Sequence, residues 1–278
     1  YETLAHFQSN LHDSRDERFF EEFDAQLNGY HSRLVHYDPN AVQTLANAVR
    51  TVLGKSTAEL SDLDAVGAVL DPAQNGYLGH SLFLAMNSKL MQTLNHVPFT
   101  FQKRISGAEE AQNQRHRGTL SSSPILSAHM RQHPDVIIPH EIRGNAAAHE
   151  EYTQTVQALW DAKNALLDDG ANVEDALYLL PNSHNVRFHE SGTLLTYYWK
   201  WVKRLCFDAQ REIFESAFEE TRQVTEVLPE IGRWVNGPPC VLRSRAGTRP
   251  ACPEGERYCG IPVWRNFDAA ELADRRVL

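Results

Sequence analysis

Apolar residues recur at three- and four-residue intervals through much of the 278-residue chain, a spacing typical of helices that pack one face on a core. Residues 39–53 form one such segment. Asp38 is expected to cap this helix, Pro39 to occupy its first position and Gly54 to end it. The expected inward face contains Val42, Leu45, Val49 and Val52.

Later segments show the same helical spacing. Residues 145–169 are expected to form a long helix and residues 172–180 a short one. Residues 192–218 are expected to form two helices with a break at 206–208, where Asp208 would cap the second helix.

Residues 96–102 alternate apolar and polar residues, as half-buried strands do, and Pro98 indicates an edge or irregular strand there. Residues 185–191 are a second strand candidate. The expected fold is α/β of the α+β kind, a sheet flanked by helices that dominate the residue count. Residues 1–236 are expected to form the main domain, with 237–278 as an irregular tail packed on it.

Composition narrows the function classes. A net charge of −9 argues against a general nucleic-acid-binding protein, which is usually basic. No apolar run approaches the length of a membrane span, and the first residues do not resemble a secretory signal. A cytoplasmic location is therefore the expectation.

One short stretch, QNQRHRG, concentrates positive charge. Ser106 and Glu109 have the spacing of a capping box, so a helix is expected to begin there and to end near Arg117. A basic triplet at a helix C-terminus is favoured by the helix dipole, which explains it without any ligand. Local anion binding is the alternative.

The stretch also carries a family resemblance. Gln112 stands three residues ahead of the triplet Arg115, His116 and Arg117, and a second block follows in KRLCFDAQREIF. Together with the preceding LNHVPFTF, these blocks resemble the flavin-dependent thymidylate synthases over residues 94–215. The second block matches at Leu180, Pro181, Arg204, Ala209, Gln210, Glu212 and Ile213.

The resemblance implies a chemistry and an assembly. The family uses FAD, reduced by NADPH, to convert the methylene group of methylenetetrahydrofolate into a methyl on C5 of the uracil of dUMP. It implies a homotetramer, whereas the absence of a nucleic-acid or membrane partner is expected from the composition. The residues expected to bind FAD are Arg115, His116, Arg117, Asn95 and Asp208, the last of which replaces a histidine that many members have near the flavin.

Arg204 is the expected catalytic residue by this resemblance. The uracil carbonyls must accept negative charge while C5 becomes nucleophilic, and a fixed guanidinium stabilises that charge. Arg204 and Gln112 would both contact the nucleotide, although a helix-terminal arginine and an exposed amide need no such role. No cysteine nucleophile is required.

The nucleotide-binding part departs from the family pattern. Ile125 occupies the usual serine position, and Ser127 with His129 is the better match after a two-residue insertion. A second expected arginine falls on Leu177. Ser123 and its neighbours, or Arg131 or Arg187, could supply the missing phosphate contacts. The substrate is thus UMP or dUMP, and the departures are similar to those of specialised members in polyoxin-type antibiotic biosynthesis.

Other functions stay open at this point. A non-catalytic flavin- or nucleotide-binding paralogue would also bind FAD, whereas a helical scaffold would not. No metal site is expected: the spacing of Cys240, Cys252 and Cys259 does not fit a short zinc knuckle, so packed thiols are favoured over a metal or a disulfide. Cys206 is expected to be a buried thiol on a helix.

Overall fold

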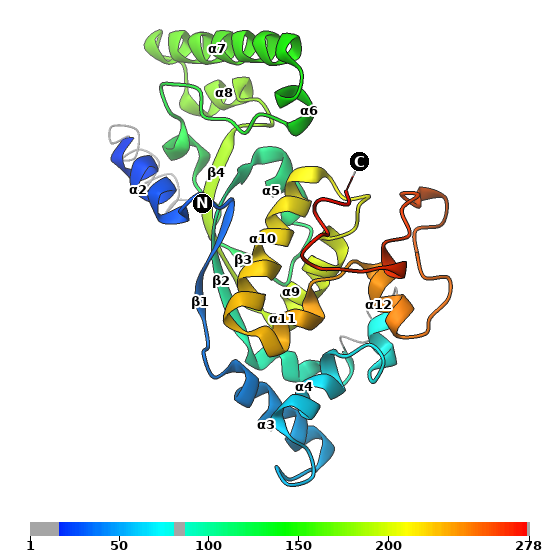
Figure 1. Ribbon diagram of the computed structural model, residues 1–278. Coiled ribbons are helices and arrows are strands. Elements are labelled where there is room, and N and C mark those ends of the chain that lie inside the picture. Colours follow the sequence, from blue (N-terminus) through cyan, green and yellow to red (C-terminus); the bar gives the residue numbers. More distant parts are fainter. Residues whose placement is uncertain (1–16, 81–86, 277–278) are drawn as a thin grey trace. The chain divides into compact units, whose positions relative to one another are not determined.

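The computed structural model of the chain describes residues 17–80 and 87–276. Four strands form one antiparallel sheet in the order β1-β2-β4-β3 (Figure 1). The strands are β1 (Ser32–Tyr37), β2 (Pro98–Ser106), β3 (Leu120–Ser121) and β4 (Asn185–Thr193). Most of the remaining described chain is helical, so the α+β expectation is confirmed.

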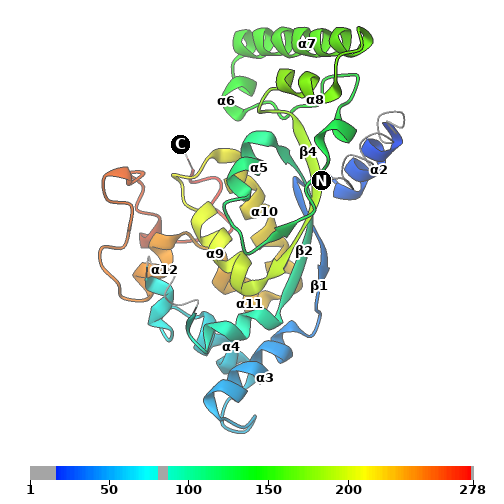
Figure 2. The ribbon, with the colours of Figure 1, turned by 180° about the vertical axis from the view of Figure 1, so that it is seen from behind.

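The chain divides into two compact units. The first contains the described residues up to His31 together with Gln102–Arg115 and Ser121–His189, and the second contains Ser32–Phe101, His116–Leu120 and Glu190–Leu278. Strands β2 and β4 contribute residues to both units. Figure 2 shows these two long strands running side by side.

In its described residues, the first unit contains five α-helices. Helix α7 is flanked by the short helices α6 and α8, and Figure 1 shows α7 and α8 side by side. Asn145 caps α7 and Gly170 follows it with a positive φ of 83°, so the expected long helix is confirmed. The helices are α2 (Glu17–Leu27), α5 (Gly107–Asn113), α6 (His140–Arg143), α7 (Ala146–Asp168) and α8 (Val173–Ala176).

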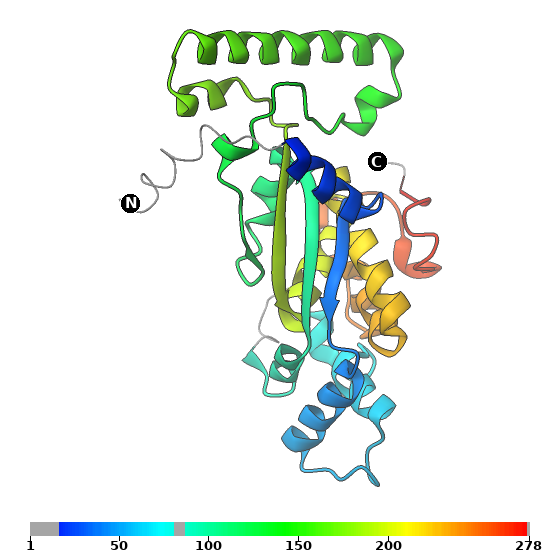
Figure 3. The same ribbon diagram turned by 90° about the vertical axis from the view of Figure 1, so that its left-hand side faces the viewer.

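The second unit holds the larger core. Figure 3 shows α10 and α11, in yellow and orange, along one side of the blue strand β1. Phe99 and Phe101 of β2 pack against Tyr197 and Trp201 of α9. The Tyr197 and Trp201 rings stack on each other with centroids 5.2 Å apart. The helices are α3 (Ala41–Leu53), α4 (Asp62–Leu70), α9 (Leu194–Arg204), α10 (Arg211–Val227), α11 (Pro229–Val235) and α12 (Pro239–Arg245).

Several element boundaries differ from the expectations. Asn40, rather than Asp38, precedes the first turn of α3, because the Asp38 carboxylate accepts the Asn40 N–H and forms a turn before the helix. The break between α9 and α10 is confirmed, but its cap is Gln210 and not Asp208. Two of the four expected inward residues of α3, Leu45 and Val49, are fully buried, whereas Val52 is exposed.

The two expected strands are present as β2 and β4. Pro98 does begin a strand, but β2 is an interior strand of the sheet and not an edge strand. Proline is tolerated there because the first residue of a strand need not donate to the ladder.

Residues 237–276 begin with a helix, α12, before the chain becomes irregular. In the described parts of the chain, no helix combines the length and the apolar character that crossing a membrane requires.

Candidate active site

The histidine of the basic triplet contacts the arginine that ends α9. Arg204 Nε donates a hydrogen bond to His116 Nε2 at 2.8 Å, within the second unit. Because Nε2 accepts this bond, the ring proton is assigned to Nδ1 and the imidazole is neutral. The two residues singled out in separate sequence blocks therefore form one contact pair.

Charge and burial keep His116 neutral. Burial, helped by the positive charges of Arg204 and Lys200 and opposed by Glu190 and Glu220, lowers the pKa of His116 to about 3. The ring remains a hydrogen-bond acceptor throughout the physiological range. It can thus orient the Arg204 guanidinium without competing with it for an anion.

A tight turn holds His116 in place. The Thr119 backbone N–H donates to the His116 carbonyl at 3.1 Å, and the Thr119 hydroxyl oxygen lies 3.0 Å from the same carbonyl oxygen. Gly118 lies against the first turn of α9, where a Cβ would be only 2.7 Å from Thr196 Cγ2. A side chain at position 118 would push the turn, and with it His116, away from the helix.

The two flanking arginines differ from His116 in exposure. Arg115 and Arg117 are exposed, and the described residues place no carboxylate within ion-pair distance of either guanidinium. Helix α5 ends at Asn113, before the triplet, because the chain turns at Gln114. The expected helix end at Arg117 is therefore wrong, and the first and third residues of the triplet are not helix-capping cations.

Asn95 and Asp208 also lie in the second unit, and both are exposed. Asn95 is held by its neighbours, since its Oδ1 accepts from Thr193 Oγ1 at 3.0 Å and its Nδ2 donates to Gln92 at 2.8 Å. Asp208 lies in the link between α9 and α10. Both side chains remain open to a ligand at the surface of this unit.

The other expected nucleotide-binding residues belong to the first unit. Ser127 and His129 lie in the 3-10 turn Leu126–His129, whereas Gln112 is half-buried on α5. Ser127 is only 5% exposed, and its hydroxyl has no hydrogen-bond partner among the described residues. Ser123 is exposed, with its hydroxyl 3.1 Å from that of Ser121.

His129 has an apolar setting. Its ring makes edge contacts with Phe19 and Phe20 at centroid distances of 5.4 and 5.9 Å. Burial lowers its pKa to about 4, helped by the charge of Arg187 and opposed by Asp135. Within the described chain its buried Nδ1 also lacks a partner, so a polar atom is available for a ligand.

A cavity of about 320 Å³ lies beside this histidine in the first unit. Its volume is within the range of small-molecule sites, and its wall combines aromatic rings with a few polar groups, as such sites do. The lining includes Phe19, Phe23, Ser122, His129, Phe188 and His189.

The two arginines considered as phosphate ligands are already paired. Arg187 contacts Asp24 at 2.8 Å and Asp135 at 2.6 Å, and Arg131 contacts Glu17 at 2.8 Å. Burial alone would lower the pKa of Arg187, but the hydrogen bonds that its guanidinium donates to Asp24 and Asp135 outweigh burial and raise the pKa. These arginines hold the fold together, and a phosphate must find other donors.

Comparison with known families decides the identity of the chain. Residues 33–230 match the family described as thymidylate synthase complementing protein. The chain belongs to this family. The match contains both Arg204 and the basic triplet, and it confirms the resemblance and the enzyme class, a methyltransferase of the thymidylate synthase type.

Three similar proteins are each named flavin-dependent thymidylate synthase. The one from Geobacter sulfurreducens is 33% identical over 60% of this chain and 70% of its own length. Those from Sulfurisphaera tokodaii and Saccharolobus solfataricus are 30% and 28% identical over 54% of this chain, and 58% and 57% of their own lengths. The chain therefore spans somewhat over half the length of these two relatives.

A buried ion cluster near His116 is not among the features expected from the sequence. Lys200 Nζ lies 2.5 Å from Glu190 and 3.6 Å from Glu220, and all three side chains are at most 1% exposed. Thr119 donates to Glu190 at 2.8 Å, which links this buried ion cluster to the turn that carries His116. A lysine between tryptophans in the run YYWKW was the available signal, since such a position faces a core and needs a partner.

Proposed function

We propose that this protein is a flavin-dependent methyltransferase that places a methyl group on C5 of the uracil of a uridine monophosphate. The proposed substrates are UMP or dUMP, with methylenetetrahydrofolate as one-carbon donor and NADPH as reductant. Family membership supports the enzyme class. The observation that carries the proposal is the hydrogen bond that joins Arg204 to the histidine of the triplet.

The residues of the triplet fit FAD. Arg115 and Arg117 are exposed guanidiniums, and in the described chain no carboxylate neutralises either one, so both can bind the pyrophosphate of the cofactor. His116 adds an anchored neutral ring between them. When bound, FAD supplies the reducing equivalents that NADPH provides for conversion of the one-carbon group to a methyl. Asn95 and Asp208 are proposed as further flavin contacts.

Arg204 is proposed to stabilise the charge that develops on the uracil carbonyls as C5 attacks the one-carbon unit. A guanidinium performs this role well only when its plane is fixed in advance. His116 provides that fixation by accepting the Nε–H, so the guanidinium orientation is set before substrate arrives. The buried ion cluster supports the same turn through Thr119.

The nucleotide is proposed to contact Gln112, Ser123, Ser127 and His129. A buried hydroxyl and a buried ring nitrogen, neither with a partner among the described residues, are suited to a ligand that brings its own donors and acceptors. Neutral donors would take the place of the missing phosphate-binding arginines. The active form is proposed to be a homotetramer, which light scattering of the FAD-loaded protein would test.

The test compares UMP and dUMP in one assay. Purified protein receives FAD, methylenetetrahydrofolate, NADPH and either nucleotide, and mass spectrometry detects the 5-methyl product. His116→Ala should bind FAD much more weakly, whereas the exposed His133→Ala, as a control, should not. A protein that binds FAD but methylates neither nucleotide would instead be a non-catalytic flavin-binding paralogue.

A further inference from the structure

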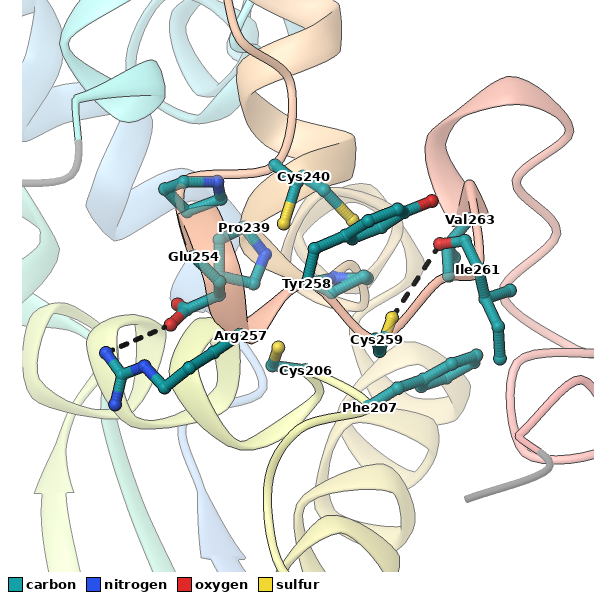
Figure 4. A pocket seen from close by; sticks show the side chains of 13 residues that line it. Cys206, Phe207, Pro239, Cys240, Glu254, Arg257, Tyr258, Cys259, Ile261 and Val263 are labelled. Carbon is teal, nitrogen blue, oxygen red and sulfur yellow. Dashed lines mark hydrogen bonds and ion pairs between the residues drawn. The ribbon is translucent and has the colours of Figure 1, made fainter.

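All four cysteines of the chain line a single pocket in the second unit. Cys206 follows α9, Cys240 lies in the first turn of α12, and Cys252 and Cys259 come from the irregular segment beyond it. Figure 4 shows the side chains of Cys206, Cys240 and Cys259 around the same space. Four thiols from three separate parts of the sequence have no reason to converge if they serve only as packing.

The pocket has the size of a single ion. Its cavity volume is about 20 Å³, roughly the space of one water molecule. The remaining wall is largely apolar, with Phe207, Pro239 and Ile261 among its members. An apolar wall shields a small cation from water and leaves the sulfur atoms as its main ligands.

The Cys259 thiol lies at a sharp turn of the chain. It donates a weak hydrogen bond to the Ile261 carbonyl at 3.8 Å, a bond that is given up when the sulfur loses its proton to bind a metal. Gly260, with a φ of 82°, turns the chain sharply directly after Cys259.

A redox role fits these thiols poorly. Burial raises the pKa of Cys206 to about 11 and that of Cys240 to about 12, so without a cation both are neutral and weakly nucleophilic. All four are free cysteines in the structure. A bound dication offsets the effect of burial by lowering the pKa of the thiols, which then lose their protons.

We propose that Cys206, Cys240, Cys252 and Cys259 bind one Zn²⁺ ion. Four sulfur ligands in tetrahedral array select zinc over harder cations, and the four thiol protons pass to solvent on binding. As they stand, no three or more His, Cys, Asp or Glu side chains in residues 17–80 and 87–276 are placed to coordinate a metal, so the thiols must rotate inward.

The site explains how the end of the chain holds its shape. After α12 the described chain contains only short 3-10 turns, Gly255–Arg257 and Val263–Arg265. Segments of this kind need a cross-link when regular hydrogen bonding is sparse. Through Cys206, the same ion would fix the link that follows Arg204 and joins α9 to α10.

Metal content of the purified, untagged protein tests the proposal directly. Elemental analysis should find about one zinc per chain, retained on dialysis and released when an organomercurial blocks the thiols. Cys240→Ser and Cys259→Ser should each lose most of it. Ser244→Ala, a small change in the same helix, should keep it.

A second measurement covers variants that fail to fold. Wild-type protein stripped of metal is titrated with Co²⁺, which should give the visible bands of a tetrahedral thiolate site and restore the protection of residues 246–276 from proteolysis. Metal-free protein that gives no such bands, a disulfide between any two of the four cysteines, or zinc retained in both cysteine variants would overturn the proposal.

Discussion

His116 and His129 are buried to a similar degree and both have a strongly lowered pKa, yet their surroundings differ. His116 accepts a hydrogen bond from Arg204, and its turn is tied by Thr119 to a buried ion cluster. His129 lies against phenylalanine rings, and Nδ1 has no partner in the described chain. One histidine is a fixed part of the protein, and the other has an unused polar atom beside a cavity.

The contrast separates positioning from binding. A ring whose acceptor is already used holds Arg204 and the basic triplet in place for the cofactor. A ring with an unused buried nitrogen lowers the stability of the protein until a ligand pairs with it. We therefore expect changes near His116 to affect stability, FAD binding and the reaction step, and changes at His129 to affect nucleotide affinity.

The largest expected effect comes from Lys200→Met. The substitution leaves Glu190 and Glu220 buried without their cation, and breaking a buried pair in this way costs about 3–5 kcal/mol of unfolding free energy. Urea unfolding measures the loss. Lys203→Met, one turn further along α9, is the control and should cost far less. Adding Glu190→Gln to Lys200→Met should recover part of the loss, and no recovery would show that the pair is not the cause.

Arg204→Ala is expected to slow methyl transfer by roughly a hundred- to a thousand-fold, since losing a charge-assisted contact to a developing anion raises the barrier by about 3–4 kcal/mol. Arg204→Lys should recover little, because an ammonium lacks the planar fork. The ratio of product formed to NADPH oxidised separates this step from flavin reduction. Arg211→Ala, at a surface ion pair, is the matched control. Near wild-type methylation would remove Arg204 from the mechanism.

His129→Phe should mainly raise the KM for the nucleotide, by about tenfold, and leave kcat nearly unchanged. The replacement keeps an aromatic ring against Phe19 and Phe20 but removes the nitrogen, and an unmade hydrogen bond to a buried group costs about 1–3 kcal/mol. Steady-state kinetics with His133→Ala as control measure the effect. A fall in kcat at constant KM would contradict this and would show that His129, like His116, acts on the reaction step.

The sequence predicted much of this arrangement, but not all of it. Helix positions followed from caps and from Gly170, which are local signals that the chain carries in order. The ion cluster around Lys200 depends on Glu190 and Glu220, which come from β4 and α10 and meet only in the fold. The pairing of Arg187 with Asp24 and Asp135 is equally non-local, so the sequence alone does not show that this arginine is unavailable to a phosphate.

The smallest expected effect is on pH dependence. Both histidines have folded pKa values, about 3 for His116 and about 4 for His129, below the ordinary value of 6.5. Above pH 6.5 both histidines are neutral in the folded and in the unfolded protein, so they add no pH dependence to the unfolding free energy. As the pH falls below 6.5, the unfolded chain takes up protons that the folded chain does not, so the unfolding free energy decreases.

Each histidine should thus lower the unfolding free energy by about 1 kcal/mol when the pH falls from 6.5 to about 5.5. His116→Asn keeps an acceptor for Arg204 but cannot titrate, so it should remove about half of this decrease, and His129→Phe the other half. Urea unfolding at pH 7 and at about pH 5.5 measures the difference. If His116→Asn alone abolished the whole decrease, His129 would be protonated as easily in the folded protein as in the unfolded chain. Its unpaired nitrogen would then be open to water, and the contrast between the two histidines would be one of solvent access instead of hydrogen bonding.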